Sequence, residues 1–336
     1  MANLRTRTNG HLMSRLIDIS PDRYQPHSLH QDDRVWAQTN CYTDLWIEVL
    51  HSLGLDPVPA LACAFSSRFD GTQWTFLKLK AEDIYALYGI EVAEMNVWRA
   101  PLIHVEDNLA VGMLSTVEVD GYWLPDTLGT SYHEGHTKTT IVPNRIDRVA
   151  GELEYFHNSG YYLLRGDDFS GVFDLDRSSL PSFVPYVEQI RLNPVHATNA
   201  GNIAEVARRN VAVRAAGNPV RELGRRVIDD LEWVQGAGMD AFHLWSFGLL
   251  RQCGASAELA ADASEFLDTA GFSGTGEAAP DFRKVASGAK SVQFQMARAP
   301  GAARWTRVNN STRWPCRGRG RWKSLPTQSA STRIDT

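Results

Sequence analysis

One cysteine of the chain stands where a nucleophile could be made. Cys41 follows Gln38 and Asn40 and begins a stretch in which apolar residues have helical spacing. The backbone N–H groups and the dipole of a helix N-terminus favour a thiolate there, and a neighbouring histidine would make it a nucleophile at neutral pH. A buried structural thiol is the alternative, and it is the preferred interpretation for Cys63 and Cys253.

A histidine-rich loop later in the chain could supply the base. His136 stands at the start of a predicted strand, 95 residues after Cys41. A cysteine on an early helix and a histidine at the start of a later strand is the order of papain-like enzymes, in which a third polar group orients the imidazole. Asn158, just after the next predicted strand (153–156), is the candidate for that group, and Asp147 is a weaker one because it falls in the hairpin between the strands.

The alternatives for His133 and His136 are two surface side chains or a metal site. The pair is three residues apart in a loop that contains glycine, and no third ligand lies nearby in the sequence. This spacing differs from the HExxH pattern, which places two ligands on one helix face. The sequence therefore predicts no metal and no bound cofactor. The residues expected to bind substrate are Gln38, Asn40, Tyr122, Asp126 and His133.

Charge is distributed unevenly along the chain, whose net charge is −5. The last 36 residues hold eight of the 34 basic side chains but only one of the 39 acidic ones, so the rest of the chain is acidic. An acidic body does not suggest a nucleic-acid binder. Within it, a basic helical segment could dock an acidic carrier protein and its phosphopantetheine phosphate, although a solvated helix face is the alternative. The docking residues expected there are Arg208, Arg209, Arg221 and Arg225.

The elements that must position these residues follow an α+β order. In the first half, helices are predicted at 41–53 and 81–88 and a short strand at 75–79. Strands are then predicted at 111–119, 122–124, 137–142, 153–156 and 161–164, with turns at 120–121, 143–144 and 158–160. Helices are predicted at 199–216, 219–237, 241–251, 255–269 and 281–298. The chain thus reads as an antiparallel sheet preceded by a helix and followed by an all-helical region.

Composition and texture divide the chain into four segments. They are a polar arm (1–33), an α+β domain (34–182), a helical domain (183–300) and a basic tail (301–336) expected to be disordered. The tail has the composition of a nucleic-acid-binding extension or of a reading-frame shift, and the frame shift is favoured. No membrane helix and no signal peptide are predicted, and four scattered cysteines predict no disulfide framework, so a cytoplasmic location is expected.

The chain resembles the domain-of-unknown-function family 1839 over about residues 30–300. Three segments carry the resemblance: NCYTDLWIEVLHSLGLDP, VDGYWLPDTLGTSYHEGHTKTTI and YFHNSGYYLLRGDDF. A more distant resemblance is to the papain-like N-terminal domain of the butirosin acyltransferase BtrH, which moves an aminoacyl group from a carrier protein onto an amine. It implies a papain-like fold, with Cys41 as nucleophile and His136 as base. Gln38 lies three residues before the cysteine rather than about six, so the backbone N–H of Cys41 is the expected oxyanion donor.

Three functional hypotheses follow. In the first, Cys41 attacks the thioester of an acyl or aminoacyl carrier protein, His136 activates the thiol, Asn158 holds the imidazole, and a small-molecule amine accepts the acyl group. In the second, the same site passes the acyl group to water, as a thioesterase or amidohydrolase does. In the third, the chain is a non-catalytic module that binds a carrier protein. The carrier supplies the phosphopantetheine in each case, and neither nucleic acid nor a membrane is an expected partner.

Overall fold

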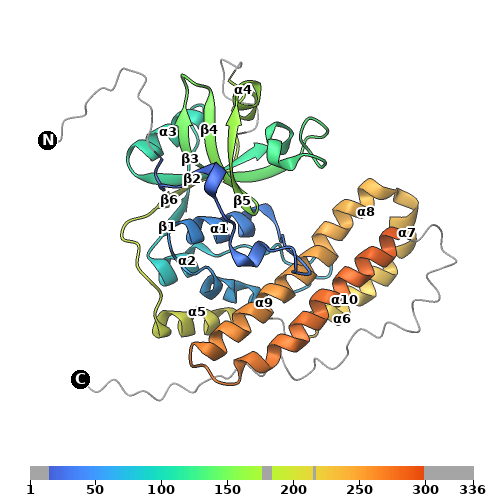
Figure 1. Ribbon diagram of the computed structural model, residues 1–336. Coiled ribbons are helices and arrows are strands. Elements are labelled where there is room, and N and C mark those ends of the chain that lie inside the picture. The colour runs from blue at the N-terminus through green and yellow to red at the C-terminus, as the bar shows by residue number, and fades with distance from the viewer. Residues whose placement is uncertain (1–14, 176–183, 215–216, 299–336) are drawn as a thin grey trace, which may run out of the picture. The chain divides into compact units, whose positions relative to one another are not determined.

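The computed structural model describes residues 15–175, 184–214 and 217–298, and it is a mixed α+β structure (Figure 1). Six strands form one antiparallel sheet in the order β1-β6-β2-β3-β4-β5. The elements of the first part are α1 (Cys41–Ser52), α2 (Ala81–Tyr88), β1 (Glu91–Glu94), α3 (Pro101–Ala110), β2 (Met113–Asp120), β3 (Lys138–Asp147), β4 (Glu152–His157), β5 (Gly160–Arg165), α4 (Asp167–Val172) and β6 (Val187–Arg191). The helices that follow are α5 (Ala200–Ala212), α6 (Pro219–Asp229), α7 (Leu231–Ala237), α8 (Met239–Ser246), α9 (Gln252–Thr269) and α10 (Ala279–Arg298).

The described residues fall into two compact units that interleave along the chain. The first contains residues up to 31, 41–55 and 88–196, and it holds the whole sheet. The second contains residues 32–40, 56–87 and those from 197 onward. The domain boundary predicted at residue 183 thus lies 13 residues before His196, where the first unit ends. The tail at 301–336 and the first 14 residues of the predicted arm lie outside the described residues.

Helix α1 packs against strands β3, β4 and β5 and forms the centre of the first unit (Figure 1). Its residues Leu45, Val49 and Leu50 are completely buried, as the helical spacing of the sequence predicts. Near its N-terminus, the Tyr42 hydroxyl donates a 2.8 Å hydrogen bond to Glu188 on β6. These contacts fix where the first turn of α1, and hence Cys41, meets the sheet.

A buried polar cluster ties residues 24–30 to α1. Glu48 of α1 is 0% exposed, and its carboxylate accepts hydrogen bonds from the Tyr24 hydroxyl and the His27 backbone N–H. The His30 imidazole contacts both Glu48 and Asp44. Burial by itself would lower the pKa of His30, but hydrogen bonds and charge from Asp44 and Glu48 raise it to about 9. His30 is therefore a buried cation at neutral pH.

Because of His30, we expect the folded state to lose stability in mild alkali. The pKa of His30 is raised from 6.5 to about 9 in the folded chain. The contribution of His30 to the free energy of unfolding is therefore complete below about pH 6.5 and is lost as the pH rises through about 9. By linkage, the pKa shift corresponds to about 3 kcal/mol. Urea unfolding of the wild type and His30→Gln between pH 6 and 10 measures it. The stability gap between the two should narrow toward pH 10, and a gap independent of pH contradicts the assignment.

Several predicted elements are confirmed, and three are wrong. Helices α1, α2, α5, α9 and α10 and strands β2, β4 and β5 lie where the sequence predicts them, within a few residues. The stretch 75–79 forms no strand, because the Leu77 N–H donates to the Gln252 side chain instead of to a ladder. Residues 121–123 form a 3-10 turn rather than a strand. The turn predicted at 143–144 lies inside β3, where the pairing with β4 shifts register between Pro143 and Arg145, as at a β-bulge.

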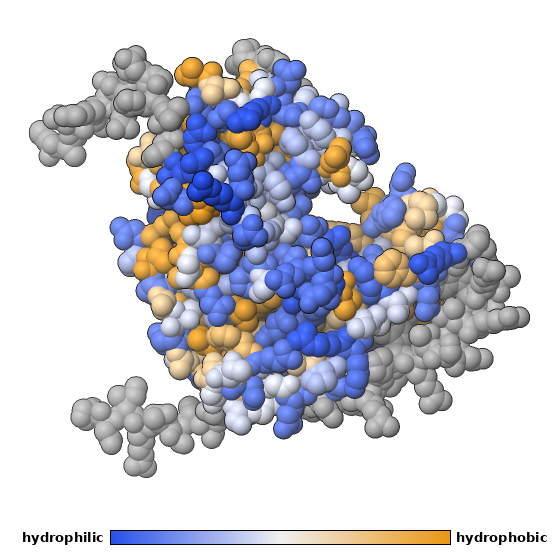
Figure 2. Space-filling view, in the orientation of Figure 1, coloured by the Kyte–Doolittle hydropathy of each residue, from blue (hydrophilic) through white to orange (hydrophobic). Residues whose placement is uncertain are grey.

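The second unit is built on α9 and α10, which pack against each other. Their contact surface is rich in alanine and receives the Trp36 indole, whose Nε1–H donates to the Ala286 carbonyl at 3.0 Å. Hydrophilic residues predominate over the outer side of α10 (Figure 2). The predicted helix 219–237 is two helices, α6 and α7, and the predicted helix 241–251 is α8 followed by a π-helical turn, Phe247–Arg251. No helix in the described part of the chain is long and apolar enough to cross a membrane.

Gly254 on α9 is expected to tolerate no side chain. A Cβ added there meets ring atoms of Trp36 at 2.4–2.6 Å, inside any real contact distance. We expect Gly254→Ala to lower the free energy of unfolding by about 1–3 kcal/mol, because the indole must move out of its packed position. Gly236→Ala on α7 is the matched control, since nothing lies within 4 Å of its added Cβ. Equal urea midpoints for the two variants contradict this packing.

Candidate functional site

Cys41 opens α1 and is partly exposed. Its Sγ lies 3.9 Å from Oγ1 of Thr140 on β3. Within the described part of the chain, no histidine is in hydrogen-bond contact with this thiol. The predicted base, His136, precedes Thr140 by four residues, which corresponds to about 13 Å of extended chain. The structure therefore places Cys41 at the helix start that the sequence predicts, but it does not bring His136 to it.

His136 instead pairs with Asp120, the last residue of β2. Its Nδ1 lies 2.6 Å from Oδ2 of Asp120, while Oδ1 accepts from the backbone N–H groups of Tyr122 and Thr137 at 3.0 and 3.1 Å. A carboxylate can only accept, so Nδ1 carries the proton and Nε2 presents its lone pair. The imidazole is 76% exposed. This is an oriented base of the kind that assists proton transfer.

Tyr122 and His133, both predicted to bind substrate, lie beside this pair. The Tyr122 ring stacks on His136 with centroids 4.7 Å apart and lies 5.1 Å from the His133 ring. His133 Nε2 is 2.9 Å from Oδ1 of Asp168 on α4, and the Tyr132 hydroxyl donates to the other oxygen of that carboxylate. The two loop histidines thus have separate carboxylates. No group of three His, Cys, Asp or Glu side chains arranged to hold a metal occurs among the described residues.

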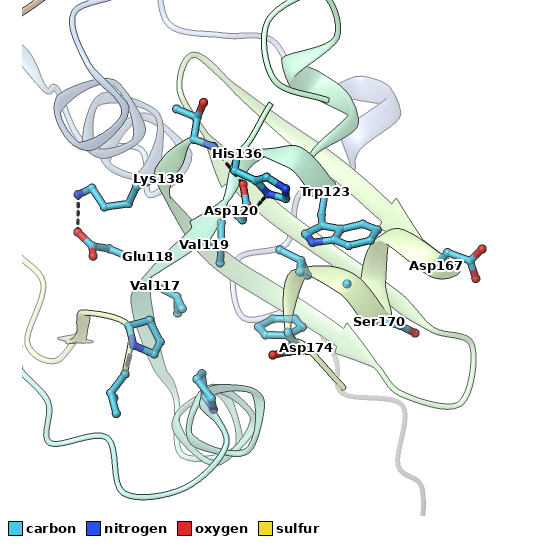
Figure 3. A pocket seen from close by; sticks show the side chains of 17 residues that line it. Val117, Glu118, Val119, Asp120, Trp123, His136, Lys138, Asp167, Ser170 and Asp174 are labelled. Carbon is cyan, nitrogen blue, oxygen red and sulfur yellow. Dashed lines mark hydrogen bonds and ion pairs between the residues drawn. The ribbon is translucent and has the colours of Figure 1, made fainter. Parts of the chain in front are cut away.

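A cavity of about 920 Å³ opens beside the His136–Asp120 pair (Figure 3). Its wall combines apolar side chains, among them Val119, Trp123 and Phe173, with polar groups such as Ser170 from α4. Figure 3 shows the hydrogen-bonded pair His136 and Asp120 next to Trp123, with Ser170 and Asp174 further along the same hollow. The lining thus mixes apolar side chains with several polar and charged ones, and a concave surface with convergent polar groups can hold a small molecule.

A second histidine that the sequence analysis does not identify as a site residue is buried at the end of β4. His157 at the end of β4 is 1% exposed, and its Nδ1 lies 2.5 Å from Oδ2 of Asp126. Asn158, the predicted orienting residue, lies 3.4 Å from this imidazole and not beside His136. It has φ 46° in the two-residue turn between β4 and β5, a conformation that asparagine tolerates. The His-Asn sequence at the end of a strand is the signal in the sequence that points to this histidine.

Of the remaining predicted substrate residues, Asp126 pairs with His157 in the first unit, whereas Gln38 and Asn40 belong to the second unit. Asn40 is buried, and its Nδ2 donates to the Leu77 carbonyl at 2.9 Å and contacts Gln252 at 3.3 Å. This is a packing role inside that unit. Gln38 is exposed and lies in the same unit.

The four predicted docking arginines lie on α5 and α6. Arg209 is hydrogen-bonded to the buried carboxylate of Asp83, and this bond raises the pKa of Arg209 above its ordinary value. It therefore joins α5 to α2. Arg208 donates to the Ala204 carbonyl of its own helix, whereas Arg221 and Arg225 on α6 make no ion pair among the described residues.

Comparison with protein-family models gives two matches. The DUF1839 N-terminal domain matches residues 25–192, and the DUF1839 C-terminal domain matches residues 196–313. The second match includes residues 301–313, the first part of the predicted basic tail. No curated protein matches the chain. The boundary between the two matched domains falls near the end of the first compact unit at His196. The chain belongs to the DUF1839 family.

Proposed function

We propose that this chain is an acyltransferase in which His136 acts as general base and the acyl group passes from a carrier-protein thioester directly to a small amine. The observation that carries the proposal is the His136–Asp120 pair beside the cavity, with Nδ1 held and Nε2 presented. Nε2 takes a proton from the amine as the amine nitrogen attacks the thioester carbon. Asp120 stabilises the imidazolium that forms, and the proton then passes to the departing thiolate.

The covalent route through Cys41 stays a prediction of the sequence. The helix that begins with this cysteine packs on an antiparallel sheet, which supports the proposed papain-like fold. However, the group beside Sγ is the hydroxyl of Thr140, and a neutral hydroxyl is too weak a base to activate a thiol in place of imidazole. The geometry therefore favours attack by the amine itself over an acyl-cysteine intermediate.

Hydrolysis of the same thioester is the second candidate, because the His136 imidazole is 76% exposed and water can reach Nε2. Exclusion of water by a bound acceptor would favour transfer. For the carrier partner, we propose docking on α6 through Arg221 and Arg225. Their guanidinium groups suit the acidic surface and phosphate of a carrier that bears phosphopantetheine. A module that only binds the carrier remains the third candidate.

One experiment separates these candidates. Purified protein is incubated with aminoacyl-loaded carrier protein and a panel of primary amines, and amide, free amino acid and carrier thiol are quantified by mass spectrometry. Amide formation above the rate without protein supports the transferase. Release of free amino acid without amide supports the thioesterase. If the thioester stays intact while the carrier binds the protein, the result supports the binding module and contradicts both enzymatic candidates.

A further inference from the structure

Three buried side chains outside the cavity form a hydrogen-bonded chain with the order of a catalytic triad. Oγ1 of Thr139 on β3 lies 2.6 Å from Nε2 of His157, and Nδ1 of His157 lies 2.5 Å from Oδ2 of Asp126. The other oxygen of Asp126 accepts from the Tyr155 hydroxyl at 2.5 Å. All four groups are positioned by regular backbone: two strands and the 3-10 turn Pro125–Thr127.

The hydrogen-bond roles within this chain follow from the carboxylate. Asp126 can only accept, so Nδ1 of His157 carries the proton, and in the neutral imidazole Nε2 has a lone pair. The Thr139 hydroxyl must then donate to Nε2. A hydroxyl that donates to an imidazole, which in turn donates to a carboxylate, is the arrangement that activates a hydroxyl nucleophile.

The hydroxyl lies close to the cavity. Thr139 pairs across the β2–β3 ladder with Val119, and opposite residues of an antiparallel pair share a face. Val119 lines the cavity, as do the two residues that precede Thr139 in β3, Thr137 and Lys138. Thr139 is 7% exposed. Neighbours of Thr139 in the sheet therefore line the cavity, and the nearly buried Thr139 lies directly behind this wall.

We propose that Thr139 is a second acyl-accepting nucleophile of this chain, with His157 as its base and Asp126 as the residue that orients the base. Oγ1 attacks the carbonyl carbon of an activated ester or thioester, and Nε2 of His157 takes the hydroxyl proton. The bond from that carbon to the leaving oxygen or sulfur breaks, and an acyl-threonine ester forms. His157 then passes the proton to the leaving group or to water. This proposal uses neither His136 nor Cys41, so it does not rest on the proposed function.

A small activated ester, p-nitrophenyl acetate, tests the proposal without a carrier protein. The full-length chain carrying Cys41→Ala is used so that the partly exposed Cys41 thiol does not compete, and acetylated positions are mapped by peptide mass spectrometry at several times. We expect acetyl on Thr139 at least tenfold faster than on exposed lysines such as Lys284. Thr139→Ser should keep the label at position 139, whereas Thr139→Val should lose it.

His157→Gln separates the proposed base from a merely reactive hydroxyl. It should slow acetylation of Thr139 at least tenfold while leaving the lysine rates unchanged, and Asp126→Asn should slow it as well. Should a variant unfold, as its urea transition reports, the wild-type and Thr139→Ser labelling still decide. No acetyl at position 139 in either chain, or labelling as fast in a folded His157→Gln as in the parent, overturns the proposal.

Discussion

Replacing His136 with glutamine is expected to lower kcat/KM for amide formation by about a hundredfold to ten-thousandfold, the usual contribution of a general base. Glutamine keeps roughly the size of the imidazole but has no basic lone pair. Asp120→Asn should also lower the rate, because an amide can donate to Nδ1 and so favours the tautomer that has no lone pair at Nε2. Both values come from the carrier-thioester assay with one fixed amine.

His243→Gln is the matched control for the His136 variants. His243 is an exposed histidine on α8, outside the cavity, and its replacement should leave the rate unchanged. A His136→Gln variant that keeps the wild-type rate while the chain remains folded contradicts the role of this pair.

Replacing Glu48 with alanine is expected to cost about 3–5 kcal/mol of unfolding free energy, the usual result of removing one member of a buried charged pair. The carboxylate is completely buried and accepts from Tyr24, His27 and His30, which all lose this acceptor at once. The loss should exceed that of any surface carboxylate, and urea unfolding at pH 7 measures it.

Glu82→Ala on α2 is the comparison for Glu48→Ala, because its side chain is exposed and replacement should change stability by less than about 0.5 kcal/mol. A loss below about 1 kcal/mol for Glu48→Ala would show that residues 24–30 are not held through this carboxylate. In that case, the position of Cys41 at the start of α1 should be the same in Glu48→Ala as in the wild type.

The local elements around the site could be read from the sequence. The apolar spacing from Leu45 to Leu50 predicts α1, and runs of β-branched and aromatic residues predict β2 and β4. Missed elements lack such a pattern. β6, Val187–Arg191, mixes apolar and charged residues and so has no clear pattern. One of its charged side chains, Glu188, is nevertheless buried, and its carboxylate accepts hydrogen bonds from the Tyr42 and Thr116 hydroxyls.

The partners within the site could not be read from the sequence. His136 meets Asp120 because β2 and β3 pair in a register that places Asp120 opposite Lys138, and register is a property of the folded sheet. Thr140, rather than His136, faces Cys41 because α1 meets the sheet four residues further along β3. Spacing along the chain gives the order of cysteine and histidine, but the point of contact is decided by how helix and sheet pack.

The rate of amide formation by Cys41→Ala tests the account most directly, because it separates direct transfer through His136 and Asp120 from an acyl-cysteine route. We expect a rate within about threefold of the wild type, since removal of a group outside the reacting centre leaves kcat/KM nearly unchanged. A fall to the rate without protein, together with an acyl adduct on Cys41 in the wild-type chain by intact mass, would contradict it. That result would make Cys41 the nucleophile that the sequence predicts.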